Sequence, residues 1–359
     1  MAVGMCSRPR RYTGAAARVA AQRVPVSRDG LDRTSLGYEK REAGFRYLAL
    51  SLEEGLTWVN VIRLLSDGAS RLSVCSPVDY PTGRAAGMAG PTPRQVSYHD
   101  AMRVHVKRRD RPAPGSISEA LGSFRAEVRF YREIAPVIGV RVPACYQAED
   151  TGEGTVLVLE DFAEWRPGAD PLAAAGVLSG MHQRWEGQAQ ARWPWLRPVG
   201  AAAELVEELF ARVWPGLAIR ADLTPPVGML GGRLVRTVAE SERAISFAGP
   251  LTLVHGDASL LNMRTGPDGQ VVLLDWEDVS AAPGVLDLAW LLVSSVEPVQ
   301  WDEVIAAYGP AVGLLRVLPA VAVQGLLSLS GTLAGSADAT AWIRRLEMTA
   351  NRLSIRSEL

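Results

Sequence analysis

The feature that most constrains this chain is a set of acidic and amide side chains placed around a predicted β-hairpin. His255, Asp257 and Asn262 follow a short apolar strand in the pattern His-x-Asp-x-x-x-x-Asn. The turn sequence Gly-Pro-Asp-Gly at 266–269 then separates two short strands, and Asp275 comes directly after the second strand. Because a hairpin reverses the chain, we expect Asn262 and Asp275 to return to the same place.

In-line phosphoryl transfer requires this combination of groups. One carboxylate must accept or orient the proton of the attacking hydroxyl, and a second carboxylate with a neutral oxygen ligand must hold Mg²⁺ against the phosphates. Magnesium prefers hard oxygen ligands and needs few protein groups, so one Asp and one Asn suffice. A lone His-Gly-Asp or a lone Asp-Trp-Glu is often only a turn or a strand end. The joint spacing indicates a phosphotransferase site.

These residues resemble the aminoglycoside-phosphotransferase-like kinase family, and in particular its ecdysteroid-kinase-like branch. That family has His-Gly-Asp and Asp-x-Glu where protein kinases have His-Arg-Asp and Asp-Phe-Gly, and this chain has the former. The resemblance implies that Asp257 is the catalytic base and that Asn262 and Asp275 bind magnesium. It also implies that Asp287, in an Asp-Leu-Ala segment, supports the catalytic loop. His255 is interpreted as a structural hydrogen-bonding residue.

A second pattern concerns Lys107 and Glu127. Lys107 ends a Val-x-Val-Lys strand, and Glu127 falls within an apolar stripe on the following helix. A carboxylate on a buried face is costly unless it is paired, and the chain has 36 Arg but only two Lys, Lys40 and Lys107. We therefore expect a Lys107–Glu127 ion pair that resembles the phosphate-contacting lysine and its helix glutamate in kinases. The alternative is an edge-strand lysine and a glutamate near solvent.

Two further nucleotide contacts are expected from position along the chain. The glycine-rich stretch with Gly87 and Gly90 precedes Lys107 and is a candidate loop over the phosphates, although an ordinary surface turn explains it almost as well. Glu160 ends an apolar strand and resembles the hinge of the family, where adenine pairs with backbone groups. Side chains at such a hinge matter little.

The order of predicted elements indicates an α+β fold with two lobes, resembling the protein-kinase-like fold. The chain has 359 residues, more than a single core usually holds, and a strand-rich first part is followed by a helical second part. We expect a basic, disordered extension at 1–45, a small β-rich nucleotide-binding lobe at 46–160, and a larger, mainly helical lobe at 161–359 that is catalytic and binds the acceptor.

Helices are expected near the following segments, which share helical apolar spacing: 119–135, 171–185, 201–213, 231–246, 300–308, 314–330 and 340–355. Three scattered cysteines form no disulfide or zinc pattern, so a cytoplasmic protein is expected. The net charge of −1 gives no reason to expect nucleic acid as a partner, and no apolar run suggests a membrane span. Oligomeric state is left open by the sequence.

The sequence is compatible with three functions. The favoured one is an enzyme that transfers the γ-phosphate of ATP, or of GTP, to a hydroxyl of a small molecule, with Mg²⁺ as cofactor. A protein kinase is disfavoured because the chain leaves no room for an activation loop after Asp275. A non-catalytic pseudokinase or nucleotide-binding module is disfavoured because Lys107, Asp257, Asn262 and Asp275 are all present.

The acceptor stays open at this point. An antibiotic such as an aminoglycoside, a macrolide or a peptide is one candidate, and a metabolic alcohol, a sugar or a steroid is another. Glu204, Glu207 and Glu208 lie on one predicted helix of the second lobe and could face a cationic antibiotic. Clustered Glu on a helix is more often a solvated face.

Overall fold

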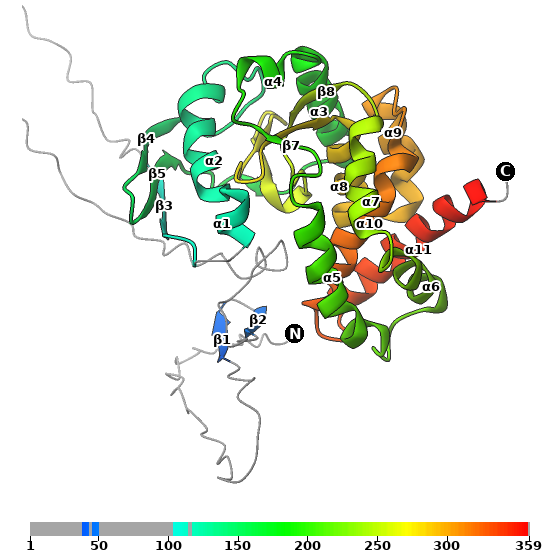
Figure 1. Ribbon diagram of the computed structural model, residues 1–359. Helices are drawn as coiled ribbons and strands as arrows, with labels where there is room; N and C mark the ends of the chain where they lie inside the picture. Colours follow the sequence, from blue (N-terminus) through cyan, green and yellow to red (C-terminus); the bar gives the residue numbers. More distant parts are fainter. Residues whose placement is uncertain (1–37, 43–44, 50–102, 114–116, 358–359) are drawn as a thin grey trace, which may run out of the picture.

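The computed structural model describes residues 38–42, 45–49, 103–113 and 117–357. It confirms the expected α+β class and the division into two lobes (Figure 1). A small sheet with two short helices forms one lobe, and a helical body forms the other. The expected boundaries at residues 45 and 160 remain predictions.

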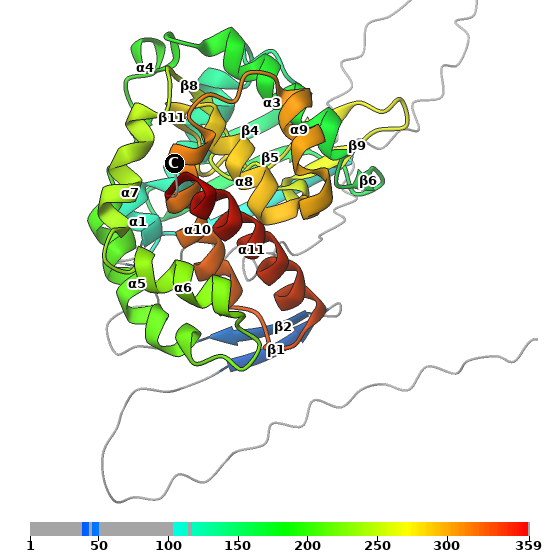
Figure 2. The same ribbon diagram turned by 90° about the vertical axis from the view of Figure 1, so that its right-hand side faces the viewer.

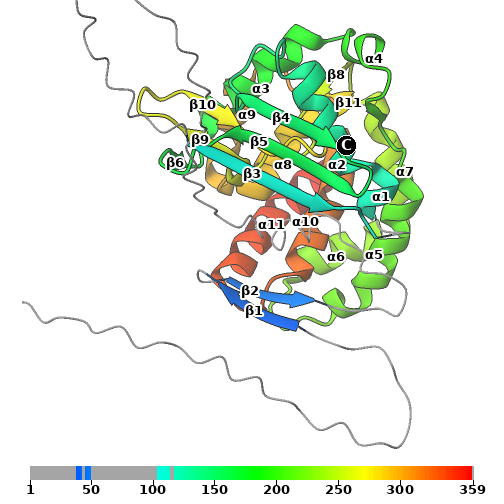
Figure 3. The same cartoon turned by 90° about the vertical axis from the view of Figure 1, so that its left-hand side faces the viewer.

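The small lobe is built on a three-stranded antiparallel sheet, seen face-on in Figure 3, with strand order β3-β5-β4. These strands are β3 (Val104–Asp110), β4 (Cys145–Asp150) and β5 (Gly154–Glu160). β5 alternates partly buried and buried residues, because one face of the sheet packs against the helices of the lobe. The register places Lys107, on the edge strand β3, opposite Leu157 of the central strand β5.

Helical structure between β3 and β4 is more broken than the expected single helix at 119–135. It consists of α1 (Ile117–Leu121), α2 (Ser123–Arg129) and the π-helical turn η2 (Phe130–Ile134). Gly122 separates the first two with a positive φ of 62°. The widened turn directs Phe130 onto Trp276, with ring centroids 4.1 Å apart and planes 7° apart.

Short strands lie between the two lobes. The hairpin expected from the sequence is formed by β9 (Met263–Thr265) and β10 (Val271–Leu273), and β6 (Arg166–Pro167) extends it. A second sheet has the order β7-β11-β8, from β7 (Arg197–Pro198), β8 (Leu251–Val254) and β11 (Ser280–Pro283). These strands and the loops after them hold the acidic residues of the candidate site.

The helical lobe surrounds α8 (Val285–Ser295) and α10 (Leu314–Ser330), which are mostly buried (Figure 2). α3 begins at Pro171 because the Asp170 side chain accepts hydrogen bonds from the amides of Leu172 and Ala173 at 3.0 Å each. Besides α8 and α10, the helices of this lobe are α3 (Pro171–Trp185), α4 (Ala189–Arg192), α5 (Ala203–Ala218), α6 (Pro225–Leu234), α7 (Val238–Ala244), α9 (Trp301–Tyr308) and α11 (Ala337–Ser357).

Several expectations are corrected by the structure. The helix expected at 231–246 is two helices, because the chain leaves helical geometry at Thr237, whose φ and ψ are −137° and 17°. Strand β4 and helix α8 were not predicted. The structure also has the antiparallel pair β1 (Tyr38–Glu42) and β2 (Phe45–Ala49), and the extension expected at 1–45 remains a prediction. Among the helices described, none is both long and apolar enough to cross a bilayer.

The Phe130–Trp276 contact joins the small lobe to the segment that follows Asp275, and it generates a stability prediction. Both rings are fully buried. Phe130→Ala should lower the free energy of unfolding by about 3–5 kcal/mol, because it leaves a cavity between the lobes. Phe247→Ala is the matched control, since its ring is 74% exposed and its loss should cost little. Urea unfolding of both variants is the measurement, and equal effects would contradict the packing role of Phe130.

Candidate active site

Lys107 lies in β3 at the centre of an ionic cluster. Its Nζ donates to both carboxylate oxygens of Glu127 at 2.9 and 2.7 Å, and to Oδ1 of Asp275 at 2.7 Å. The predicted Lys107–Glu127 pair is therefore present, and Glu127 is only 2% exposed. Burial alone would lower the pKa of Lys107, but the carboxylates of Asp275 and Glu127 outweigh it and raise the pKa above its usual value.

A third carboxylate, that of Glu277, joins the cluster. Its Oε2 lies 3.9 Å from Lys107 Nζ and 2.5 Å from Nη2 of Arg109, the next inward-facing residue of β3. One carboxylate oxygen from each of Glu127, Asp275 and Glu277 lies within 4.8 Å of the others. This spacing allows the three oxygens to share one cation, and hard oxygen donors are the ligands that Mg²⁺ prefers.

The loop that follows β8 and contains Asp257, called the catalytic loop, is held by Asp287 of α8. Its Oδ2 accepts from the backbone N–H of His255 at 2.7 Å, and its Oδ1 accepts from the N–H of Gly256 at 2.9 Å. His182 Nε2 lies 3.1 Å from Oδ2. Burial acts to raise the pKa of Asp287, but the hydrogen bond and charge of His182 and the donation from His255 lower it overall. The lowered pKa favours the anionic form of Asp287, and its supporting role remains a prediction.

Gly256 is the position in this loop where glycine is required. Its φ is +83°, and a Cβ there would lie 2.2 Å from the carbonyl oxygen of Asp278. His255 uses both ring nitrogens in the loop: Nδ1 lies 3.2 Å from the amide of Asp257, and Nε2 lies 2.8 Å from the carbonyl of Leu274. Both ring nitrogens thus lie within hydrogen-bonding distance of backbone atoms, and the structural role expected of His255 remains a prediction.

Asp257 is fixed by two donors. Asn262 Nδ2 donates to its Oδ2 at 2.8 Å and to its backbone carbonyl at 2.9 Å. The indole N–H of Trp290, in α8, donates to Oδ1. Sequence reasoning missed Trp290, although it lies three residues after Asp287 and therefore on the same face of the helix. Asp257 is 3% exposed, and these two hydrogen bonds contribute to the orientation of its carboxylate.

The hairpin brings Asn262 next to Asp275, as predicted. The amide of Leu274 donates to the backbone carbonyl of Asn262 at 2.8 Å, and Leu274 directly precedes Asp275. Among the described residues, Asp275 is the one non-glycine with a positive φ, at 64°, a strained geometry that often marks functional sites. Because the amide nitrogen of Asn262 serves Asp257, its amide oxygen is the atom left to bind a metal. The Asn262 and Asp275 oxygens therefore fit magnesium.

The last two candidates for nucleotide contact are Glu160 and the glycine-rich stretch. The carboxylate of Glu160 accepts from Arg141 Nη2 at 2.5 and 2.6 Å and from the amide of Ala144 at 3.0 Å. Its side chain is thus engaged within the small lobe, and its backbone N–H donates to the carbonyl of Ala144 at 2.8 Å. Gly87 and Gly90 lie outside the described residues, so the glycine loop remains a prediction.

Comparisons with known proteins find a matching family model and similar solved structures. The family model of the phosphotransferase enzyme family (APH) matches residues 103–322. An aminoglycoside phosphotransferase of Streptomyces rimosus, solved with ADP and streptomycin, is 18% identical and covers 63% of this chain and 86% of its own, with a TM-score of 0.44. A choline kinase of Streptococcus pneumoniae is 16% identical, with 70% and 87% covered and a TM-score of 0.46. No curated protein matches the chain.

The Trp290 contact yields a prediction about the orientation of Asp257. Trp290→Phe keeps the apolar ring but removes the N–H, so we expect kcat to fall about tenfold or more, with an unchanged KM for nucleotide. Trp301→Phe is the control, because its buried N–H instead donates to the carbonyl of Val296 at 3.1 Å. Steady-state kinetics on both variants is the measurement. An equal loss in both would mean that Trp290 acts through packing alone.

Proposed function

Because this chain belongs to the phosphotransferase enzyme family, as the sequence predicted, we propose that it transfers the γ-phosphate of ATP or GTP to a hydroxyl of a small molecule. The observation that carries this proposal is the joint placement of Asp257, held by Asn262 and Trp290, beside the cluster of Lys107 with Asp275. Both groups meet at the end of β10, where the backbone of Leu274 bonds to His255 and to Asn262.

In the proposed reaction, Lys107 neutralises phosphate oxygens while Glu127 fixes its ammonium group. Mg²⁺, when bound, supplies the charge that stabilises the transferring phosphoryl group, and Asn262 and Asp275 would hold it. Asp257 accepts the proton of the acceptor hydroxyl as the new O–P bond forms and the bond to the nucleoside diphosphate breaks. The catalytic contribution of the protein is therefore positioning and electrostatic stabilisation.

The two alternatives are less well supported. A pseudokinase is expected to lack one of the reacting groups, whereas Lys107, Asp257, Asn262 and Asp275 are all present and adjacent. A protein kinase needs a long activation segment after the metal-binding Asp. Here β11 begins at Ser280 and pairs with β8 next to the catalytic loop, and α8 begins at Val285. The residues between Asp275 and the start of β11 are too few to form an activation segment.

The acceptor class and the cell compartment remain proposals. An antibiotic such as an aminoglycoside or a macrolide is one candidate, and resistance would then be the biological role. Glu204 and Glu208 are exposed on α5, and Glu204 pairs with Arg243. Glu207 is partly buried and accepts from the amide of Ala239 at 3.5 Å, so the three glutamates do not form one solvated face. A cytoplasmic location agrees with the cysteine pattern of the sequence.

The role of Asp257 is tested by replacing it. Asp257→Ala should lower kcat by about 10²- to 10⁴-fold, because a general base acts in the transition state. Nucleotide affinity should change little. Titration calorimetry and steady-state turnover measure the two quantities, and Asp302→Ala, at a side chain 88% exposed, is the control. Near-normal turnover in Asp257→Ala would show that another group accepts the proton.

A further inference from the structure

A cavity of about 290 Å³ lies beside the catalytic loop. It is bounded by α1 and α2 of the small lobe and by α5, α7, α8 and α10 of the helical lobe. Its lining includes Gly256, which directly precedes Asp257 in the sequence. It also includes Trp290, whose indole N–H donates to the Asp257 carboxylate. A molecule in this cavity therefore extends toward the carboxylate proposed as the base. The proposal below rests on the phosphotransferase function proposed above.

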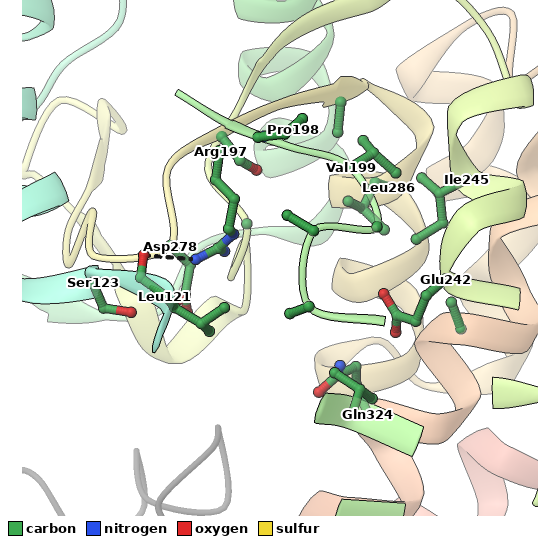
Figure 4. A pocket seen from close by; sticks show the side chains of 18 of the residues that line it. Leu121, Ser123, Arg197, Pro198, Val199, Glu242, Ile245, Asp278, Leu286 and Gln324 are labelled. Carbon is green, nitrogen blue, oxygen red and sulfur yellow. Dashed lines mark hydrogen bonds between the residues drawn. The ribbon is translucent and has the colours of Figure 1, made fainter. Parts of the chain in front are cut away.

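The walls of the cavity are largely apolar. They are formed by Leu121, Val199, Leu205, Ile245, Leu286 and Val321, from five helices and one loop (Figure 4). Burial of hydrocarbon against such walls is the main source of affinity in small-molecule sites, and a few polar groups then fix the orientation. The volume is at the low end of the roughly 300–1,000 Å³ of ordinary ligand sites. The cavity thus suits a compact, partly apolar acceptor.

Two polar side chains lie together in this apolar wall, away from the catalytic loop. Glu242 of α7 and Gln324 of α10 face each other in Figure 4 and are hydrogen-bonded. The amide oxygen of Gln324 is buried and has no hydrogen-bond partner, so its amide nitrogen is the donor to Glu242. Within the described part of the chain, no cation lies within ion-pairing distance of Glu242. The amide oxygen of Gln324 is therefore an acceptor without a donor, and the Glu242 carboxylate beside it accepts from the Gln324 amide nitrogen.

Burial raises the pKa of Glu242 to about 7, against the lowering effects of the Gln324 hydrogen bond and the Arg197 charge. The other charged groups near the cavity are engaged elsewhere: Arg109 with Glu277, and Glu204 of α5 with Arg243 of α7. Arg197 donates to the carbonyl of Leu121 at 3.4 Å and lies beside Asp278 (Figure 4). Glu242 is partly buried, and a cation next to it would offset the cost of placing its negative charge in a largely apolar cavity.

We propose that the acceptor is an amino alcohol with an apolar body and a single amine. Its ammonium group lies between the carboxylate of Glu242 and the amide oxygen of Gln324, and its hydroxyl lies at the Trp290 end, against Asp257. The single carboxylate of Glu242, at the end of the cavity away from Trp290, suits a single amine. Polycationic sugars with many polar groups are therefore expected to bind poorly against the apolar walls. Glu242 and Gln324 are then the residues that determine specificity.

The test uses ω-amino alcohols from 6-aminohexanol to 12-aminododecanol, each with the alkanol of equal length. Thermal shift measures binding to the full chain without nucleotide, and release of nucleoside diphosphate measures turnover. At least one amino alcohol should bind about tenfold more tightly than its alkanol. Glu242→Gln should remove this preference by raising KM, with kcat unchanged. The preference should grow from pH 6 to pH 8 as Glu242 ionises.

Glu240→Gln is the matched control, because Glu240 is exposed on the same helix. Gln324→Leu, which removes the second acceptor, should weaken binding of the amino alcohol in the same direction. The proposal is overturned if amino alcohols and alkanols bind equally across the series, or if Glu242→Gln leaves the preference intact. Binding without any nucleotide turnover would instead contradict the proposed phosphotransferase function, because the thermal shift reports on the cavity alone.

Discussion

The ion pairs of the partly buried Lys107 ammonium group are the interactions on which the rest of the site depends. The ammonium group holds Glu127 from the small lobe and Asp275 from the loop after the hairpin within hydrogen-bonding distance of one point. Buried charges are costly unless they are paired, so each carboxylate needs the lysine and the lysine needs them. The cluster therefore fixes how the small sheet meets the catalytic loops, and the Phe130–Trp276 stack supports the same junction with apolar contact.

A second buried charge organises the other half of the site. Asp287 binds two consecutive backbone N–H groups of the catalytic loop, and Trp290, one turn later in α8, binds the side chain of Asp257. A single buried helix thus determines both the path of the loop and the direction of the reacting carboxylate. The same helix lines the cavity next to Glu242, which links the position of the base to the position of the acceptor.

The sequence predicted the parts of the site that have local patterns. Lys107 and Glu127 were found because a glutamate in an apolar stripe needs a cation, and Asn262 and Asp275 because a hairpin reverses the chain. Helix α8 was missed because residues 285–293 are apolar on every side except at Asp287, so no helical period is visible. Trp290 was missed with it. The Glu242–Gln324 pair joins two helices distant in sequence, which only tertiary structure reveals.

The account depends on the claim that Lys107, Asp275 and Asn262 form a magnesium–nucleotide site. The most direct measurement is the change in melting temperature on adding ATP or GTP, with and without Mg²⁺, for the unmodified chain and for Asp275→Ala. A ligand that binds the folded state stabilises it by mass action. We predict a nucleotide-induced rise that Mg²⁺ enhances in the unmodified chain and no longer enhances in the variant. The account is contradicted if neither nucleotide raises the melting temperature, or if the variant keeps the full magnesium effect.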